Sequence, residues 1–138
     1  MTRAATEALI TRYLAAFNAG DTSGMLDCLA DDVVHDVNQG GERRAGKERF
    51  RAFAERMAYH YAEQLADIVV MSSEDGRRAA AEFNVSGTYL KTDEGLPPAV
   101  GQTYRLPAGI FFAVGDGRIT RVTTYYNLTD WIAQVIAE

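Results

Sequence analysis

The chain has 138 residues, 47% of them hydrophobic and 24% charged, and a net charge of −5. This length predicts one domain, residues 1–138, with a core of its own. The composition excludes a disordered chain and a fibrous repeat. The negative charge argues against a nucleic-acid partner, and Glu42 and Glu48 are interleaved with the basic residues of segment 43–51. That segment fits a solvated helix face or, alternatively, a rim that attracts an anionic substrate.

Compartment and cofactors follow from what the sequence lacks. Cys28 is the only cysteine, so no internal disulfide can form, and it fits a core position in a reducing compartment. The N-terminal residues lack a signal peptide's apolar stretch, and no segment is long enough to span a bilayer, so we expect a cytoplasmic protein without a membrane partner. The histidines and the cysteine are too scattered for a metal site, and no phosphate-binding glycine motif occurs. We therefore expect no cofactor.

Three amphipathic patterns precede the long strands. Apolar residues recur with the helical period over residues 4–17, in a short segment capped by Asp21, and over residues 46–61. A β-branched segment at residues 33–38 predicts a short strand before the third helix. The apolar positions that define the three helices are Ile10, Tyr13, Leu14 and Phe17, then Met25, Leu26 and Leu29, then Phe50, Phe53 and Met57.

From residue 65 onward the hydrophobic period changes from helical to alternating. Two Asp-Gly turns predict two hairpins, with strands at residues 65–72, 77–90, 104–114 and 118–126. Pro97-Pro98 places residues 91–101 in a loop, and residues 129–137 predict a last helix. The order predicts an α+β fold in which three N-terminal helices pack on a strongly curved antiparallel sheet, followed by a short C-terminal helix. A curved sheet of this kind forms a cone with an internal apolar pocket.

Several segments resemble a known family. Residues 12–21, Arg-Tyr-Leu-Ala-Ala-Phe-Asn-Ala-Gly-Asp, with Leu-Ala-Asp-Asp at 29–32, closely resemble the N-terminal third of bacterial ketosteroid isomerases. The element order is similar to the nuclear transport factor two-like (cystatin-like) superfamily, which includes SnoaL-like polyketide cyclases and limonene epoxide hydrolase. Gly-Leu-Pro-Pro at 95–98 resembles a loop of SnoaL-like cyclases, and segments 35–40 and 125–128 resemble ketosteroid isomerase-related proteins. The superfamily hosts isomerases, cyclases, dehydratases and inert binding domains.

The resemblance implies catalytic residues one by one. In ketosteroid isomerases an aspartate base moves a proton, while a tyrosine and a protonated aspartic acid hydrogen-bond the enolate oxygen. Tyr13 matches the tyrosine, although it also fits a core aromatic. Asp36 is the implied base, but it lies one residue closer to Tyr13 than in the family, so either Asp36 faces inward or His35 and Val37 do. A gap-free match puts Gly109, which has no donor, in place of the protonated acid.

The same resemblance implies a lining for the pocket. Asn38 suits a carbonyl or hydroxyl group of a ligand or, alternatively, a turn. Trp131 suits a lid or a core anchor. Ordinary core packing is the alternative for the aromatic and aliphatic candidates. The substrate-binding candidates are His35, Asn38, Phe53, Phe111, Val122, Thr124, Tyr126 and Trp131.

These residues lead to competing hypotheses. The first is a cofactor-independent isomerase- or cyclase-like enzyme that acts on a small apolar carbonyl compound through an enolate-type step, with Asp36 as base and Tyr13 as donor. The second is a non-catalytic domain for ligand binding or dimerisation, which Gly109 and the shifted spacing favour. A third, epoxide hydration, needs another inward carboxylate, for which Glu82 is the only spare candidate. The resemblance also implies a homodimer through the outer sheet face.

Overall fold

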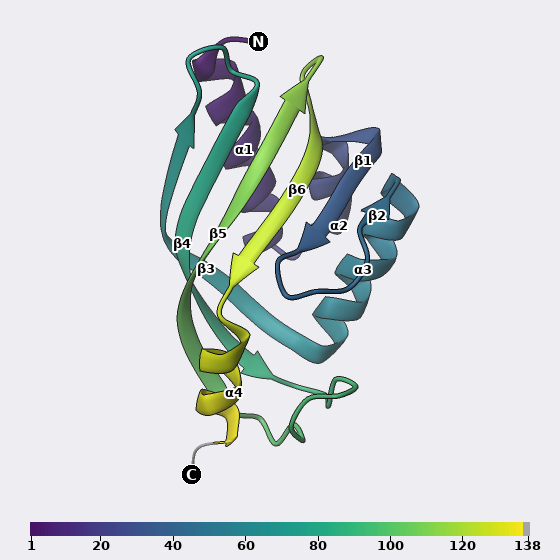
Figure 1. The fold of residues 1–138 in the computed structure, drawn as a ribbon, viewed down its shortest axis with the longest axis vertical. Coiled ribbons are helices and arrows are strands. Elements are labelled where there is room, and N and C mark those ends of the chain that lie inside the picture. Colours follow the sequence, from purple (N-terminus) through teal and green to yellow (C-terminus); the bar gives the residue numbers. More distant parts are fainter. Residues whose placement is uncertain (137–138) are drawn as a thin grey trace.

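A computed structural model gives the fold and describes residues 1–136 (Figure 1). It confirms the α+β class. The helices are α1 (Arg3–Asn18), α2 (Thr22–Asp27), α3 (Lys47–His60) and α4 (Leu128–Ile136). The strands are β1 (Leu29–Val37), β2 (Arg44–Ala45), β3 (Tyr61–Ser72), β4 (Arg78–Tyr89), β5 (Thr103–Gly115) and β6 (Arg118–Tyr126). The short strand β2 was not expected, and the expected last residue of the final helix, Ala137, lies outside the described residues.

The strands form one open sheet in the order β2-β1-β6-β5-β4-β3. All neighbours pair antiparallel except β1 and β6, which run parallel, so the sheet is mostly antiparallel, as expected, with one parallel pair that was not expected. Parallel strands need a long crossover connection. Residues 38–117 connect β1 to β6 in this way and bring the chain back in the same direction. Asp116 and Gly117 have φ values of 52° and 75°, which suit the tight turn between β5 and β6.

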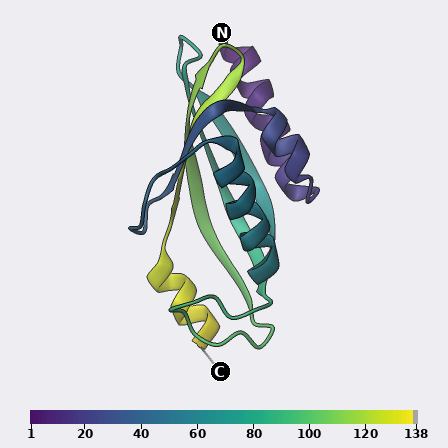
Figure 2. The ribbon, with the colours of Figure 1, turned by 90° about the vertical axis from the view of Figure 1, so that its right-hand side faces the viewer.

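The helices α1, α2 and α3 cover one face of the sheet (Figure 2). We call this the inner face, and the opposite one the outer face. Side chains alternate between the faces along each strand. On β5, Ile110 and Phe112 are buried inward, whereas Phe111 between them is 50% exposed on the outer face.

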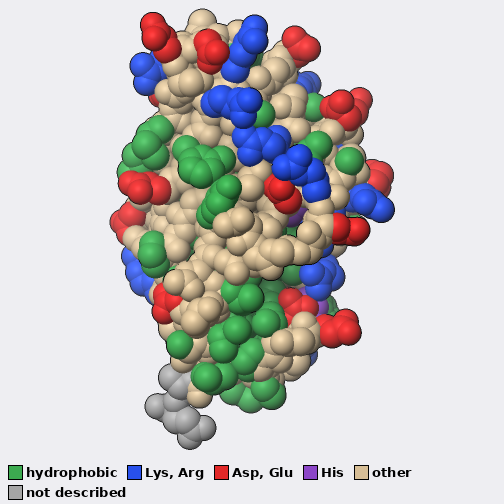
Figure 3. All heavy atoms as spheres, viewed as in Figure 1, with side chains coloured by type: hydrophobic (Ala, Val, Ile, Leu, Met, Phe, Trp, Pro, Cys, Tyr) green, Lys and Arg blue, Asp and Glu red, His purple; other side chains and the backbone are tan. Residues whose placement is uncertain are grey.

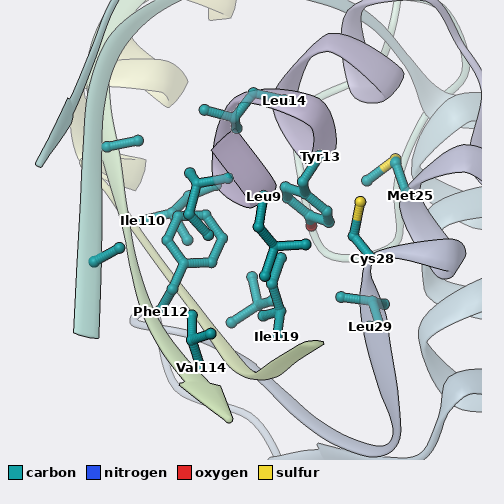
Figure 4. Close-up of a cluster of buried hydrophobic side chains, with 14 of the residues drawn as sticks. Leu9, Tyr13, Leu14, Met25, Cys28, Leu29, Ile110, Phe112, Val114 and Ile119 are labelled. Carbon is teal, nitrogen blue, oxygen red and sulfur yellow. The ribbon is translucent and has the colours of Figure 1, made fainter. Parts of the chain in front are cut away.

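The inner face and the helices enclose the main hydrophobic core (Figure 4). Leu14 of α1, Leu29 of β1 and Phe112 of β5 are each at most 1% exposed. Burying one such side chain stabilises the fold by about 1.5–3 kcal/mol. Cys28 lies in this core as a free cysteine, as expected from the sequence.

Two amide side chains bind strand backbone that would otherwise lack a partner. Asn18, at the end of α1, donates to the Leu65 carbonyl (3.0 Å) and accepts from the Leu65 amide (2.8 Å). Gln134 of α4 forms the same pair of bonds with Arg105 of β5, at 2.9 Å each, beyond the end of β6. Both side chains therefore act like a short neighbouring strand and fasten their helices to the sheet.

Two hollows lie on the surface, away from the core. One, of about 640 Å³, is on the sheet near Ser86, Gly87 and Arg105, and the other, of about 480 Å³, is near Asp31, Lys47 and Arg118. The expected internal pocket is therefore not among them. Within residues 1–136, no helix is long and apolar enough to cross a membrane.

Candidate functional site

Strand β1 separates two neighbouring candidates, His35 and Asp36, onto opposite faces. His35 is 4% exposed and pairs in register with the buried Val122, so it faces inward. Asp36 pairs with Thr123, which lies opposite the outward Phe111. Of the two alternatives left open by the sequence, the structure has His35 facing inward and Asp36 facing outward, because successive strand residues alternate and no bulge intervenes between residues 34 and 37.

On the outer face, Asp36 is held by an arginine. Its Oδ2 accepts hydrogen bonds from Nε and Nη2 of Arg43, at 3.1 and 3.0 Å, whereas the buried Oδ1 has no partner among the described residues. Burial raises the pKa of the Asp36 carboxyl, but Thr123 and Arg43 outweigh this and bring it below its usual value. Asp36 is thus an ionised, paired carboxylate.

His35 lies between two aromatic rings of α3. Its ring centroid is 5.1 Å from that of Phe50 and 4.5 Å from that of Phe53. The Nδ1 atom is buried and has no hydrogen-bond partner within residues 1–136. Burial, together with the Arg44 charge, lowers the pKa of the imidazole from 6.5 to about 4, although Asp36 acts in the opposite direction. His35 is therefore neutral at pH 7, with a lone pair or a ring proton available to a ligand.

Tyr13 reaches the same region from α1 and is 4% exposed. Its ring meets Phe50 and Phe112 edge-on, with centroids 6.4 and 5.7 Å away, inside the core (Figure 4). Burial raises the pKa of the phenol, which keeps it protonated at neutral pH. Its hydroxyl makes no hydrogen bond to any other described residue. Tyr13 and His35 thus share one aromatic neighbour, Phe50, and each keeps a polar group that has no hydrogen-bond partner within residues 1–136.

The other candidates are divided between the faces. Phe53 packs on His35, and Val122, Thr124 and Tyr126 alternate inward along β6. Phe111, which was expected to line the pocket, faces outward instead. The difference arises at a bulge, since the β5–β6 register shifts between Ala113 and Val114 and a gap-free match cannot follow it. The remaining outcomes are that Gly109 and Glu82 lie opposite each other on the outer face, that Asn38 is exposed, and that Asn127 caps α4.

A half-buried carboxylate at the far end of the inner face was missed. Glu63 of β3 accepts a 2.6 Å hydrogen bond from the Tyr104 hydroxyl, and burial raises the pKa of its carboxyl. The Tyr104 ring lies over Gly87, where a Cβ would come within 2.3 Å of it. The alternation of Tyr61, Glu63 and Leu65 could have revealed this position, but the strand was expected to begin only at residue 65.

Trp131 belongs to this far end. Its ring contacts those of Tyr61, Tyr89 and Tyr104 edge-on, with centroids 5.9, 4.9 and 5.7 Å away. Asp93 lies beside them and accepts from the Tyr61 hydroxyl (2.7 Å). We call this group the aromatic–carboxylate cluster; its members are Tyr61, Glu63, Tyr89, Asp93, Tyr104 and Trp131. Within the described part of the chain, no three His, Cys, Asp or Glu side chains are grouped to hold a metal ion.

Comparison with known proteins places this geometry in a family. The model of the SnoaL-like domain matches residues 10–122. The chain belongs to the SnoaL-like family. A solved structure from Pseudomonas putida KT2440 is 59% identical, with 98% of each chain covered and a TM-score of 0.92. Another, from Silicibacter sp. TM1040, is 57% identical, with 99% of each chain covered and a TM-score of 0.94.

Both of these relatives are described as a "putative polyketide cyclase". An LEH-like epoxide hydrolase from M. tuberculosis has a TM-score of 0.75 at 19% identity, covering 97% of this chain and 86% of its own. That similarity is one of fold alone. The SnoaL-like assignment supports a function of the cyclase or isomerase type.

Proposed function

We propose that this SnoaL-like protein is a cofactor-independent enzyme that moves a proton on a small apolar carbonyl compound, with His35 as the base and Tyr13 as the hydrogen-bond donor. The observation that carries the proposal is the buried Nδ1 of His35, which has no hydrogen-bond partner among the residues that the structure describes. A buried polar atom without a hydrogen bond costs stability, so its retention favours a role in binding or catalysis. The role first given to Asp36 passes to His35 because Asp36 faces outward and is paired.

The proposed step uses the neutral imidazole. With the ring proton on Nε2, Nδ1 takes a proton from the carbon next to the substrate carbonyl. The C–H electron pair then forms the enolate double bond, and the carbonyl oxygen gains a negative charge that the Tyr13 hydroxyl stabilises. Return of the proton to another carbon completes an isomerisation. Attack of the enolate carbon on a second carbonyl group completes a cyclisation, with the new alkoxide taking the proton.

The low pKa of His35 bears on this step. An imidazole with a pKa of about 4 is always unprotonated at pH 7 but is a weak base. The enolate that forms beside it is an anion, and an anion nearby raises the pKa of the imidazolium. The His35 imidazole therefore becomes a stronger base as the reaction approaches the transition state.

Deuterium uptake tests this proposal without knowledge of the substrate. The protein is incubated in D2O with cyclic and aryl ketones such as 1-tetralone, and exchange at the carbon next to the carbonyl is followed by NMR. We expect His35→Asn to lose the acceleration and Tyr13→Phe to lower it by about 10²–10³. Asp36→Asn is the matched control on the opposite face and should keep it. Loss in Asp36→Asn alone would return the base role to Asp36.

A non-catalytic ligand-binding domain is the second candidate. It is favoured by the tight packing around Tyr13, which fits a core aromatic, and by the absence of an acid at Gly109. It predicts that ketones or other apolar ligands bind without any exchange of their protons. Absence of exchange for all ketones, together with measurable binding, would select it.

We also propose that two copies pair through the outer face. Large apolar side chains are exposed there: Val69 (47%), Met71 (45%), Phe111 (50%) and Tyr125 (39%). Figure 3, viewed onto this face, shows hydrophobic side chains beside a line of Lys and Arg. Exposed apolar patches of this kind mark association sites. Size-exclusion chromatography with light scattering should give the mass of a dimer, and Phe111→Glu should give a monomer.

A further inference from the structure

Arg44 stands beside the proposed catalytic histidine. It lies on β2, at the sheet edge next to β1 and α3 (Figure 1), and is paired in register with His35. Cross-strand partners project their side chains to the same face. The Arg44 guanidinium carbon is 4.7 Å from the centroid of the Phe53 ring, which in turn contacts His35. Arg44, Phe53 and His35 therefore form one group.

Within the described part of the chain, the Arg44 guanidinium lies over the Phe53 ring but pairs with no carboxylate. The neighbouring Arg43 binds Asp36 at 3.0 Å, and Lys47 lies 3.7 Å from Asp31. Arg44 takes part in none of the ion pairs or side-chain hydrogen bonds among residues 1–136. It is only half-exposed, so water satisfies its donors in part. A planar guanidinium in this state is suited to bind a carboxylate through parallel hydrogen bonds.

The Arg44 guanidinium and the His35 ring thus both contact Phe53, and neither the guanidinium nor the buried Nδ1 of His35 has a hydrogen-bond partner among residues 1–136. Phe50 and Phe53 supply the apolar surface between and beside them. A positive charge and a neutral imidazole bordered by aromatic rings suit a molecule with an apolar body, a carbonyl group and an anionic end. A neutral ketone would leave the guanidinium unused.

We infer that Arg44 binds a carboxylate of the substrate, so that the substrate class is an apolar keto acid. This inference rests on the proposed function for the carbonyl chemistry, but the carboxylate site itself does not depend on it. The bound carboxylate orients the molecule so that its reactive carbon lies toward His35.

The test compares two ligands that differ only in charge. 2-Naphthoate and 2-naphthamide share the same ring system, and calorimetry or NMR titration gives their affinities at low ionic strength. We expect naphthoate to bind the wild type roughly tenfold or more tightly than naphthamide. Arg44→Met should remove this difference, whereas Arg43→Met, one residue away on the outer face, should keep it. Arg44→Lys should retain part of it, because it keeps the charge and loses the fork.

Some outcomes would overturn the inference. Equal affinity of the wild type for naphthoate and naphthamide would overturn it, even if every variant failed to fold. An equal effect of Arg43→Met and Arg44→Met on the affinity difference would also overturn it. The outcome for the proposed function is separate. Arg44-dependent binding of naphthoate without any deuterium exchange on ketones would keep this inference and reject the reaction. Exchange that depends on His35, combined with indifference to ligand charge, would reject this inference alone.

Discussion

The inner sheet face carries two buried polar regions that differ in how their hydrogen bonds are satisfied. At one end, the Nδ1 atom of His35 has no hydrogen-bond partner among residues 1–136, and the nearby Arg44 contacts the Phe53 ring but no carboxylate of that range. At the other end, Tyr104 donates to Glu63, and Tyr61 and Arg56 both donate to Asp93. Both regions combine aromatic rings with titratable groups. Only the aromatic–carboxylate cluster satisfies its polar groups from within the protein.

This difference separates stability from function. A satisfied buried network holds its elements together, and removing one partner is costly. An unsatisfied buried group contributes no such stability and is retained where a ligand completes it. The comparison predicts that substitutions in the aromatic–carboxylate cluster mainly change the free energy of unfolding. Substitutions at His35 should mainly change activity.

The largest expected effect is that of Trp131→Ala. Trp131 is 4% exposed and joins α4 to three tyrosines, so its truncation leaves a cavity that the neighbours cannot fill. We expect the free energy of unfolding in urea to fall by about 3–5 kcal/mol. Ile136→Ala on the same helix, where the side chain is 59% exposed, is the control and should cost far less. Similar losses for both variants would show that the cluster is not a distinct structural unit.

The pH dependence of stability should distinguish His35 from the cluster. His35 has a pKa of 6.5 in its unperturbed state and about 4 in the fold, so between these values the unfolded chain binds the extra proton. The stability due to neutral His35 is therefore present above pH 6.5 and is lost as the pH falls toward 4. The loss is on the order of 2–3 kcal/mol.

Comparison with His35→Leu isolates this contribution. The raised pKa of Glu63 acts in the opposite direction, because stability from a protonated carboxyl is lost as the pH rises above 4.5. The lowered pKa of Asp36 acts like His35 but only in the more acidic range below 3.8. Urea titrations of the wild type and of His35→Leu are compared from pH 7 to 4. The contributions of Glu63 and Asp36 are common to both proteins and cancel in the difference. A difference that does not grow as the pH falls would contradict a buried neutral His35.

A smaller effect is expected for Tyr104→Phe. The substitution leaves the ring in place over Gly87 but removes the hydroxyl that donates to Glu63. We expect a loss of about 1–3 kcal/mol in urea, because the half-buried carboxyl of Glu63 is left without its donor. Tyr125→Phe, on the exposed outer face, is the matched control and should have no measurable effect. If deuterium exchange on ketones fell with Tyr104→Phe while stability did not, the catalytic end would have been assigned to the wrong region.

Much of the fold could be predicted from the sequence because its signals are local. The helical period around Tyr13, the cap at Asp21 and the Asp-Gly turns depend on neighbouring residues only, and the corresponding helices and strands are present within a few residues of their expected ends. The short strand β2 left no such signal, since two residues cannot show a period. It nevertheless positions Arg44, so the sequence could not indicate that this one basic residue of its segment lies beside His35.

The structure was needed to show on which face of the sheet each candidate side chain lies. Periodicity shows that neighbours such as His35 and Asp36 lie on opposite faces but not which face the helices cover. The register of β1 on β6 decides this, and it depends on pairing across a long crossover. Phe111 was placed on the wrong face because a bulge between Ala113 and Val114, in its own β5–β6 pair, shifts the register. The Glu63–Tyr104 pair was missed because its partners lie on strands far apart in the sequence.

The smallest effect concerns His35→Leu at pH 8, where the comparison is sharpest. Leucine has no polar atom to leave unsatisfied and suits the space between Phe50 and Phe53. Replacing an unpartnered buried polar group with an apolar one is neutral or stabilising, so we expect the free energy of unfolding to stay the same or rise by up to about 1 kcal/mol. Deuterium exchange on ketones should be lost in the same variant. A loss of 2 kcal/mol or more, as is roughly expected for breaking a satisfied buried network, would instead mean that His35 is a structural residue like those of the aromatic–carboxylate cluster.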